Sequence, residues 1–110
     1  MATFHTSLAQ GRWQELSLAE QMGHIGSEIE RALAWRGRND TVHAERALER
    51  ALELFDLTMS DARWVGRLKE LARAREVVCD FFWGGNSYRS SPEALQKYFF
   101  SFALAARRGR

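Results

Sequence analysis

Apolar residues recur at three- and four-residue steps along four stretches of this chain, which is the spacing of one face of an α-helix. The most regular stretch runs from Ser17 to Trp35. It begins with Ser17 and Glu20 in the spacing of a capping box, in which each side chain binds the other residue's backbone amide. Its apolar face consists of Leu18, Met22, Ile25, Ile29, Ala32 and Leu33. The pattern predicts a first helix whose apolar face is covered by the later segments.

Three further helices follow from the same period. The second is expected from about Asp40 to Met59, with an inner face of Ala44, Ala47, Leu48, Ala51, Leu54, Phe55 and Thr58. The third is expected from about Asp61 to Phe82, with an inner face of Trp64, Leu68, Leu71, Val78 and Phe82. The fourth starts at Ser91-Pro92, a strong helix-start signal, and runs to about Arg107. The residues expected on its inner face are Leu95, Tyr98, Phe99, Phe102, Ala105 and Ala106.

No stretch shows the two-residue period of a β-strand, so the fold class is all-α. Four amphipathic helices with short links favour antiparallel neighbours and hence an up-and-down four-helix bundle. Gly37 can take a left-handed position after the first helix, and Asn39 or Asp40 can cap the second. Gly23 and Gly26 lie inside the first helix, where each costs about 1 kcal/mol relative to alanine. We therefore expect a neighbouring segment to approach both glycines closely.

A chain of 110 residues is expected to form a single domain, 1–110. Residues 1–16 would form an arm packed on the bundle, because the large apolar Phe4, Leu8 and Trp13 would not be left in water. Cys79 is the single cysteine, which suits a reducing compartment, and its apolar neighbours indicate a core residue. Neither a signal peptide nor a membrane-spanning stretch is recognisable, so we expect a cytoplasmic protein without membrane contact.

The net charge is +2, with basic and acidic residues interleaved along each helix. No basic stripe with interleaved aromatic residues occurs, so nucleic-acid binding is not expected. His24 has Glu20 and Glu28 one turn to either side, but a second Glu-x-x-His motif of a di-iron bundle is missing. We therefore predict no metal and no cofactor. No serine lies in a Gly-x-Ser-x-Gly elbow either, so no catalytic residue is assigned from that chemistry.

Several charged residues fall on or beside the predicted helix seams. The main ones are Glu28, Asp56, Arg75 and Asp80. Because a seam arginine is costly unless it is paired, we expect Arg75 to meet Glu28 or Asp56. Two interpretations stay open for this set. It forms a structural ion-pair network, or it lines a polar pocket between helices that binds a small ligand.

The fourth helix is apolar on nearly every side, because Phe100 and Leu104 lie away from its inner face. Such a helix needs a partner on more than one side. We therefore expect a homodimer whose interface includes Tyr98, Phe100 and Leu104.

Arg38 and His43 fit the Arg-x4-His spacing typical of HEPN ribonucleases, which are also small helical bundles. This resemblance implies that His43 would act on a ribose hydroxyl while Arg38 holds the phosphate. The pair straddles the link before the second helix, so we expect the two side chains to converge only where two subunits meet. Arg38 and His43 are accordingly the only catalytic candidates, in a metal-independent ribonuclease.

Three long stretches, GRWQELSLAEQMGHIGSEIERAL, RLKELARAREVVCDFFWGGNSY and SPEALQKYFFSFALAAR, resemble a family of small bacterial all-helical proteins without an assigned activity. The resemblance implies a compact helical fold and transfers no site. The leading hypothesis is therefore a non-enzymatic helical bundle that self-associates and binds a protein partner, as an antitoxin-like or nucleotidyltransferase-associated subunit. The alternatives are the HEPN-type ribonuclease and small-ligand binding in the polar pocket.

Overall fold

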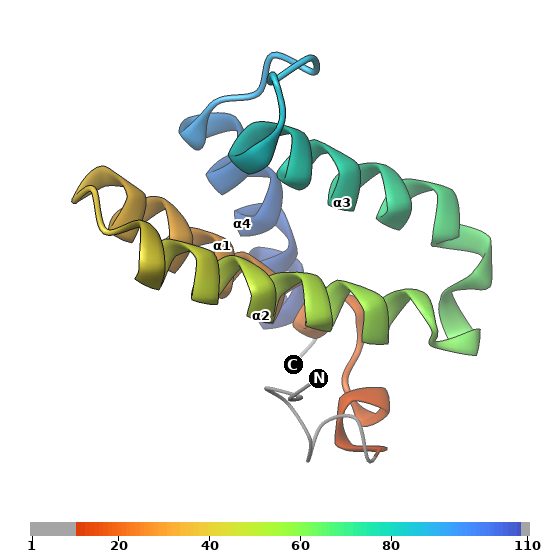
Figure 1. Cartoon of the computed structure of the whole chain (residues 1–110). Helices are drawn as coiled ribbons and strands as arrows, with labels where there is room; N and C mark the ends of the chain where they lie inside the picture. The colour runs from red at the N-terminus through yellow and green to blue at the C-terminus, as the bar shows by residue number, and fades with distance from the viewer. Residues whose placement is uncertain (1–10, 109–110) are drawn as a thin grey trace.

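The structure is a computed structural model that describes residues 11–108. Its elements, in chain order, are η2 (Trp13–Glu15), α1 (Leu18–Gly37), α2 (Thr41–Met59), η3 (Ala62–Arg67), α3 (Leu68–Trp83) and α4 (Pro92–Arg108) (Figure 1). No strand occurs within these residues, and the all-α helical-bundle fold is confirmed. No helix of the described chain is long and apolar enough to span a membrane.

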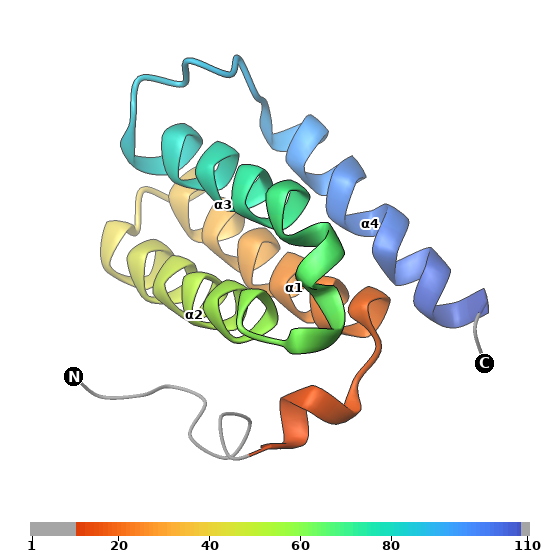
Figure 2. The same ribbon diagram turned by 90° about the vertical axis from the view of Figure 1, so that its right-hand side faces the viewer.

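Helix α1 is the centre of the fold. It packs along α2 on one side and against α4 on the other, while α3 lies against α2 and η3. In both views α1, α2 and α3 run alongside one another, whereas α4 crosses α1 obliquely (Figures 1 and 2). The fourth helix therefore covers only part of the length of α1.

The predicted starts of α1, α2 and α4 are confirmed. The Ser17 Oγ accepts a hydrogen bond from the Glu20 amide at 3.1 Å, and the Glu20 carboxylate accepts one from the Ser17 amide at 3.0 Å. Asp40 caps α2 by accepting a hydrogen bond from the His43 amide, and Ser91 caps α4 by accepting one from the Ala94 amide. The expectation for Gly37 is wrong. Gly37 stays in α1, and Asn39 takes the left-handed conformation with a φ of 60°.

The prediction of one continuous third helix is wrong at its beginning. Asp61 accepts hydrogen bonds from the Arg63 amide and guanidinium, which tightens the first turns into the 3₁₀ segment η3. Trp64 interrupts the helical geometry there, with φ −106° and ψ 17°. As a result Leu68, which was expected to face inward, is exposed.

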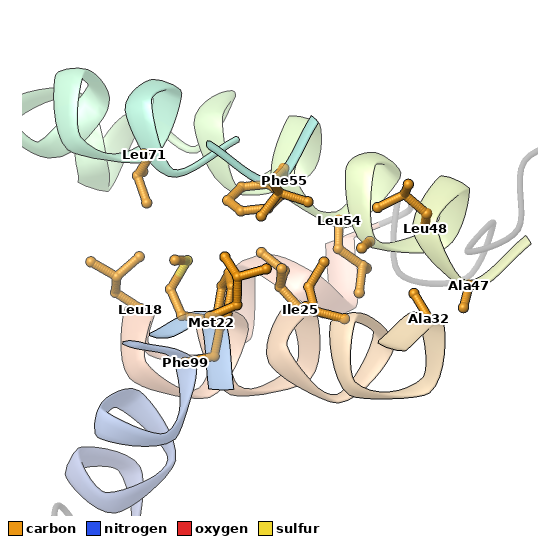
Figure 3. Packing of buried hydrophobic residues seen from close by; sticks show 14 of the residues in the cluster. Leu18, Met22, Ile25, Ala32, Ala47, Leu48, Leu54, Phe55, Leu71 and Phe99 are labelled. Carbon is orange, nitrogen blue, oxygen red and sulfur yellow. The ribbon is translucent and has the colours of Figure 1, made fainter. Parts of the chain in front are cut away.

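Most of the predicted core is confirmed. All seven residues expected on the inner face of α2 are buried. They meet Leu18, Met22 and Ile25 of α1, with Leu71 and Phe99 completing the cluster (Figure 3). Trp13 is also buried, as expected for the arm, whereas Phe4 and Leu8 lie outside the described residues.

The two glycines of α1 differ. A Cβ atom at Gly26 would lie 2.6 Å from the Phe99 Cβ, so this glycine allows α4 to approach. A Cβ atom at Gly23 would meet no atom of residues 11–108 within 4 Å. The expectation of close approach is therefore confirmed for Gly26. For Gly23 it is not met within the described chain, and residues 1–10 of the arm lie outside that part.

This difference predicts opposite effects of the same substitution. Gly26→Ala should lower the free energy of unfolding by about 1–3 kcal/mol, because the overlap with Phe99 forces α4 away. Gly23→Ala should raise it by about 1 kcal/mol through helix propensity alone. Urea unfolding followed by circular dichroism measures both. Stabilisation by both substitutions would show that α4 does not need the close approach at Gly26.

Candidate functional site

The polar residues predicted on the helix seams do not form one site. Glu28 is buried on α1 and makes ion pairs with Arg31 of its own helix and with Arg50 of α2, whose Nε lies 2.6 Å from Oε2. Because both carboxylate oxygens are paired with guanidinium groups, Glu28 serves to hold α1 and α2 in register.

The remaining members of that set lie elsewhere. Arg75 pairs with Asp56 at 3.0 Å, which confirms one of the two partners predicted for it. Asp56 is largely exposed, so the pair contributes little to stability. Asp80 accepts a hydrogen bond from the Tyr88 amide at 3.1 Å and shapes the loop between α3 and α4. The set is therefore three separate contacts, and none of its members lines either of the cavities described below.

The structure brings Arg38 and His43 to the same side chain within one chain. The His43 ring stacks on Trp35 with centroids 4.5 Å apart, and the Arg38 guanidinium lies 5.5 Å from the centre of the same indole. The His43 Nδ1 also lies 2.8 Å from an Asp40 carboxylate oxygen. Both side chains contact Trp35, and the expectation that they converge on a substrate only where two subunits meet stays a prediction. Both are exposed, and neither lines the cavities described below.

A buried polar network joins the chain before α1 to the turn after α2. The Gln21 carboxamide donates to the Trp13 carbonyl at 2.9 Å and to the Asp61 carboxylate at 3.4 Å, and it accepts from the Trp64 indole at 2.9 Å. The Trp13 indole donates to Thr58 at 3.0 Å. Because these groups are mutually satisfied, the network is structural. The network could not be predicted from the sequence pattern, because Gln21 lies beside an apolar stripe and belongs to no recognisable motif.

The network predicts sensitivity to acid. Hydrogen bonds from Arg63, opposed by burial, hold the pKa of Asp61 below its usual value. The stability that this contributes is present above the unfolded-state pKa of about 3.9 and is lost as the pH falls through the lower folded-state pKa. Asp61→Asn should therefore destabilise the protein at neutral pH and make its stability less dependent on pH between neutral and acid conditions.

Urea unfolding at a series of pH values measures this effect. The control is Glu45→Gln, which changes an exposed carboxylate on α2. An Asp61→Asn variant whose stability falls in acid as steeply as that of the wild type would exclude Asp61 as the source.

A cavity of about 290 Å³ lies between α3 and α4. Its walls are largely apolar and include Ala74, Val77, Leu95 and Tyr98. The Tyr98 hydroxyl is buried and has no hydrogen-bond partner within residues 11–108. Burial, followed by the charge of Glu70, raises the pKa of Tyr98, so this hydroxyl stays protonated. Tyr98 therefore packs beside α3 within the chain, and its part in the predicted interface stays a prediction.

Removing that hydroxyl should stabilise the protein. Tyr98→Phe keeps the ring packing and relieves a buried unpaired polar group, so we expect a gain of about 1 kcal/mol in the free energy of unfolding. The matched control is Tyr88→Phe, which removes an exposed hydroxyl that donates to Glu76. Thermal and urea unfolding of both variants test this, and a loss of stability in Tyr98→Phe would mean that the hydroxyl is paired.

A second and larger hollow, of about 410 Å³, lies between α1 and α4. We call it the α1–α4 groove and define it by its lining residues Gly23, Gly26, Ser27, Ile29, Glu30, Leu95, Gln96, Lys97, Phe99, Phe100 and Ala103. It exists because three of its five lining residues on α1 are small, namely Gly23, Gly26 and Ser27. The Ser27 hydroxyl donates to the Gly23 carbonyl at 3.2 Å and so stays close to its own helix.

Phe100 is part of this groove, and its side chain is 55% exposed. Leu104 is half-buried and follows one turn later on the same side of α4. Two opposite charges also belong to the groove, Glu30 on α1 and Lys97 on α4. Neither makes an ion pair within residues 11–108, in contrast to Glu28 and Arg31 on the neighbouring turn.

The described residues contain no cluster of histidine, cysteine and carboxylate side chains that could hold a metal ion. His24 is exposed and lies with its ring 5.8 Å from that of Trp13. Cys79 is half-buried, and burial raises the pKa of its thiol, so it is a poor nucleophile. The α1–α4 groove is therefore the best candidate for a functional surface, and the chemistry that it offers is packing and charge pairing.

Comparison of the chain with protein-family models, curated proteins and solved structures gives no match. Membership of the bacterial helical family that the sequence resembles stays a prediction.

Proposed function

We propose that the protein is a non-enzymatic helical module that self-associates through the α1–α4 groove. The observation that carries the proposal is the position of Phe100, which is 55% exposed and lies beside an open hollow. A lone exposed apolar residue needs no explanation. An exposed aromatic side chain next to a hollow lined by glycines is different, because together they supply both the protruding and the receiving part of an interface.

Other exposed apolar residues lack this setting. Val65 in η3 is 74% exposed and Val42 at the start of α2 is 65% exposed. Neither lines the groove or the α3–α4 cavity. Exposure alone therefore does not distinguish Phe100, whereas its place in the groove does.

The expected gain in free energy is sufficient for a measurable dimer. Full burial of a phenylalanine side chain contributes about 1.5–3 kcal/mol relative to leaving it exposed. A symmetric dimer buries two copies of each residue, which doubles the contribution of Phe100. Leu104 extends the same apolar side of α4 and adds to the buried area.

In the proposed role the protein is a subunit of a cytoplasmic assembly. An antitoxin-like complex and a complex with a nucleotidyltransferase are two settings for such a subunit. The ribonuclease and ligand-pocket hypotheses gain no support from the site. Arg38 and His43 rest on Trp35 outside any described cavity, and the seam charges are used in separate structural contacts.

The proposal predicts that Phe100→Ser weakens dimerisation strongly. Losing both buried phenylalanines costs about 3–6 kcal/mol, so the dissociation constant should rise at least about a hundredfold. The matched control is Val65→Ser, which also replaces an exposed apolar residue and should leave the dissociation constant unchanged. Sedimentation equilibrium over a concentration series measures both, and circular dichroism verifies that the variants are folded. A wild-type protein that stays monomeric at high micromolar concentration would refute the proposal.

A further inference from the structure

The arrangement of apolar groups and charges in the α1–α4 groove indicates how two copies meet. Phe100 and the hollow lie on one face of the molecule. When Phe100 and the hollow share a face, two copies related by a two-fold axis can each insert Phe100 into the hollow of the other. Such an arrangement is a closed dimer. If Phe100 and the hollow lay on different faces, each contact would leave a free protruding part and a free hollow, and the chains would polymerise.

The directions of the two helices are fixed within the chain. Gly26 of α1 touches Phe99 of α4, and a shallow hollow one to two turns further along α1 is lined by Ala34 together with Pro92. Residue numbers increase along α1 in the direction in which they decrease along α4, so the two helices are antiparallel. Both helices rise equally per residue, so Glu30 lies at the level of Leu95 and Gln96, less than one turn from Lys97, and Gly23 lies at the level of the residues after Phe100.

These levels distinguish the two ways in which a second α4 can lie over the groove. Lys97 and Phe100 are three residues apart, so they share one side of α4 and lie one turn apart. With Phe100 placed over the glycines of the partner, Lys97 lies over Glu30 when the two α4 helices are parallel. In the antiparallel orientation Lys97 lies beyond Gly23, where the next carboxylate of α1 is Glu20, which already accepts a hydrogen bond from the Ser17 amide of its own chain.

We propose that two copies of this chain bind about a two-fold axis with their α4 helices parallel, so that each Phe100 enters the α1–α4 groove of the other and each Lys97 faces the other's Glu30. This inference rests on the proposed function and specifies its geometry. It accounts for Glu30 and Lys97, the two charged residues among the described lining of the groove, neither of which makes an ion pair within residues 11–108. The cross pairs form twice and set the orientation of the dimer more than its strength.

Charge reversal in separate chains tests the pairing. Glu30→Lys makes both charges of the groove positive, and Lys97→Glu makes both negative. Each variant alone should dimerise at least about tenfold more weakly than the wild type, since every cross pair becomes a repulsion. An equimolar mixture should form the mixed dimer at least about tenfold more readily than either homodimer. Native mass spectrometry with one variant isotopically labelled measures all three species.

Mixing separates contacts between chains from contacts within one chain. If Glu30 and Lys97 interacted only within their own chain, both variants would lose that contact and mixing would not restore it. The double variant Glu30→Lys/Lys97→Glu should dimerise like the wild type. The preference for the mixed dimer should also fall as salt is raised.

A matched control uses the other lysine of the chain. Lys69→Glu on α3 and Glu49→Lys on α2 are the same two reversals at exposed positions outside the groove. Their mixture should show no preference for a mixed dimer. A mixture of the groove variants without such a preference would overturn the proposed geometry. If Phe100→Ser nevertheless abolishes dimerisation, self-association through the groove stands. If the wild type is monomeric, both proposals fall.

Discussion

The fold depends on the hydrogen bonds of one buried amide. Gln21 is fully buried, and a buried carboxamide is tolerated only if its donors and its acceptor are paired. Its partners come from two separate segments, Trp13 before α1 and Asp61 with Trp64 after α2. Moving either of these segments would leave a polar group unpaired away from water. The amide therefore fixes where the chain enters α1 and how it leaves α2, and the apolar core fills the space that these constraints define.

The hydrogen bonds of Gln21 also affect the path of the chain after α2. Because Trp64 is turned toward Gln21, the chain after α2 makes the 3₁₀ segment η3 before α3 begins. Helix α3 then lies along α2, while α4 lies on α1. The cavity with Tyr98 lies between α3 and α4. On α1 the contact at Gly26 sets the distance of α4, and no residue of the described chain (11–108) fills the space beside Gly23 in the groove. Two glycines three residues apart thus have opposite roles.

The helices, their caps and the inner face of α2 could be predicted from the sequence, because these features depend on local spacing. The Arg75–Asp56 pair could be predicted as well, since a seam arginine needs a carboxylate. The break at Trp64 could not, because it results from a hydrogen bond to a residue more than forty positions away. For the same reason Gly23 and Gly26 could not be told apart. Their difference depends on where an oblique α4 crosses α1.

The candidate site was predicted in part. Helix α4 is apolar around most of its circumference, and the sequence shows this without showing which neighbour each side meets. The structure divides that circumference in three. Leu95 and Phe99 are buried in the core, Tyr98 lines the cavity beside α3, and Phe100 is left largely exposed.

A four-helix arrangement in which α4 has neighbours on two sides cannot cover a helix that is apolar on three. The uncovered side of α4 lies next to the small residues of α1. The exposed apolar surface of α4 and the space left by the small side chains of α1 therefore lie on the same face. Either feature alone would be an ordinary irregularity of a small bundle, but their coincidence favours recognition of another molecule on this face.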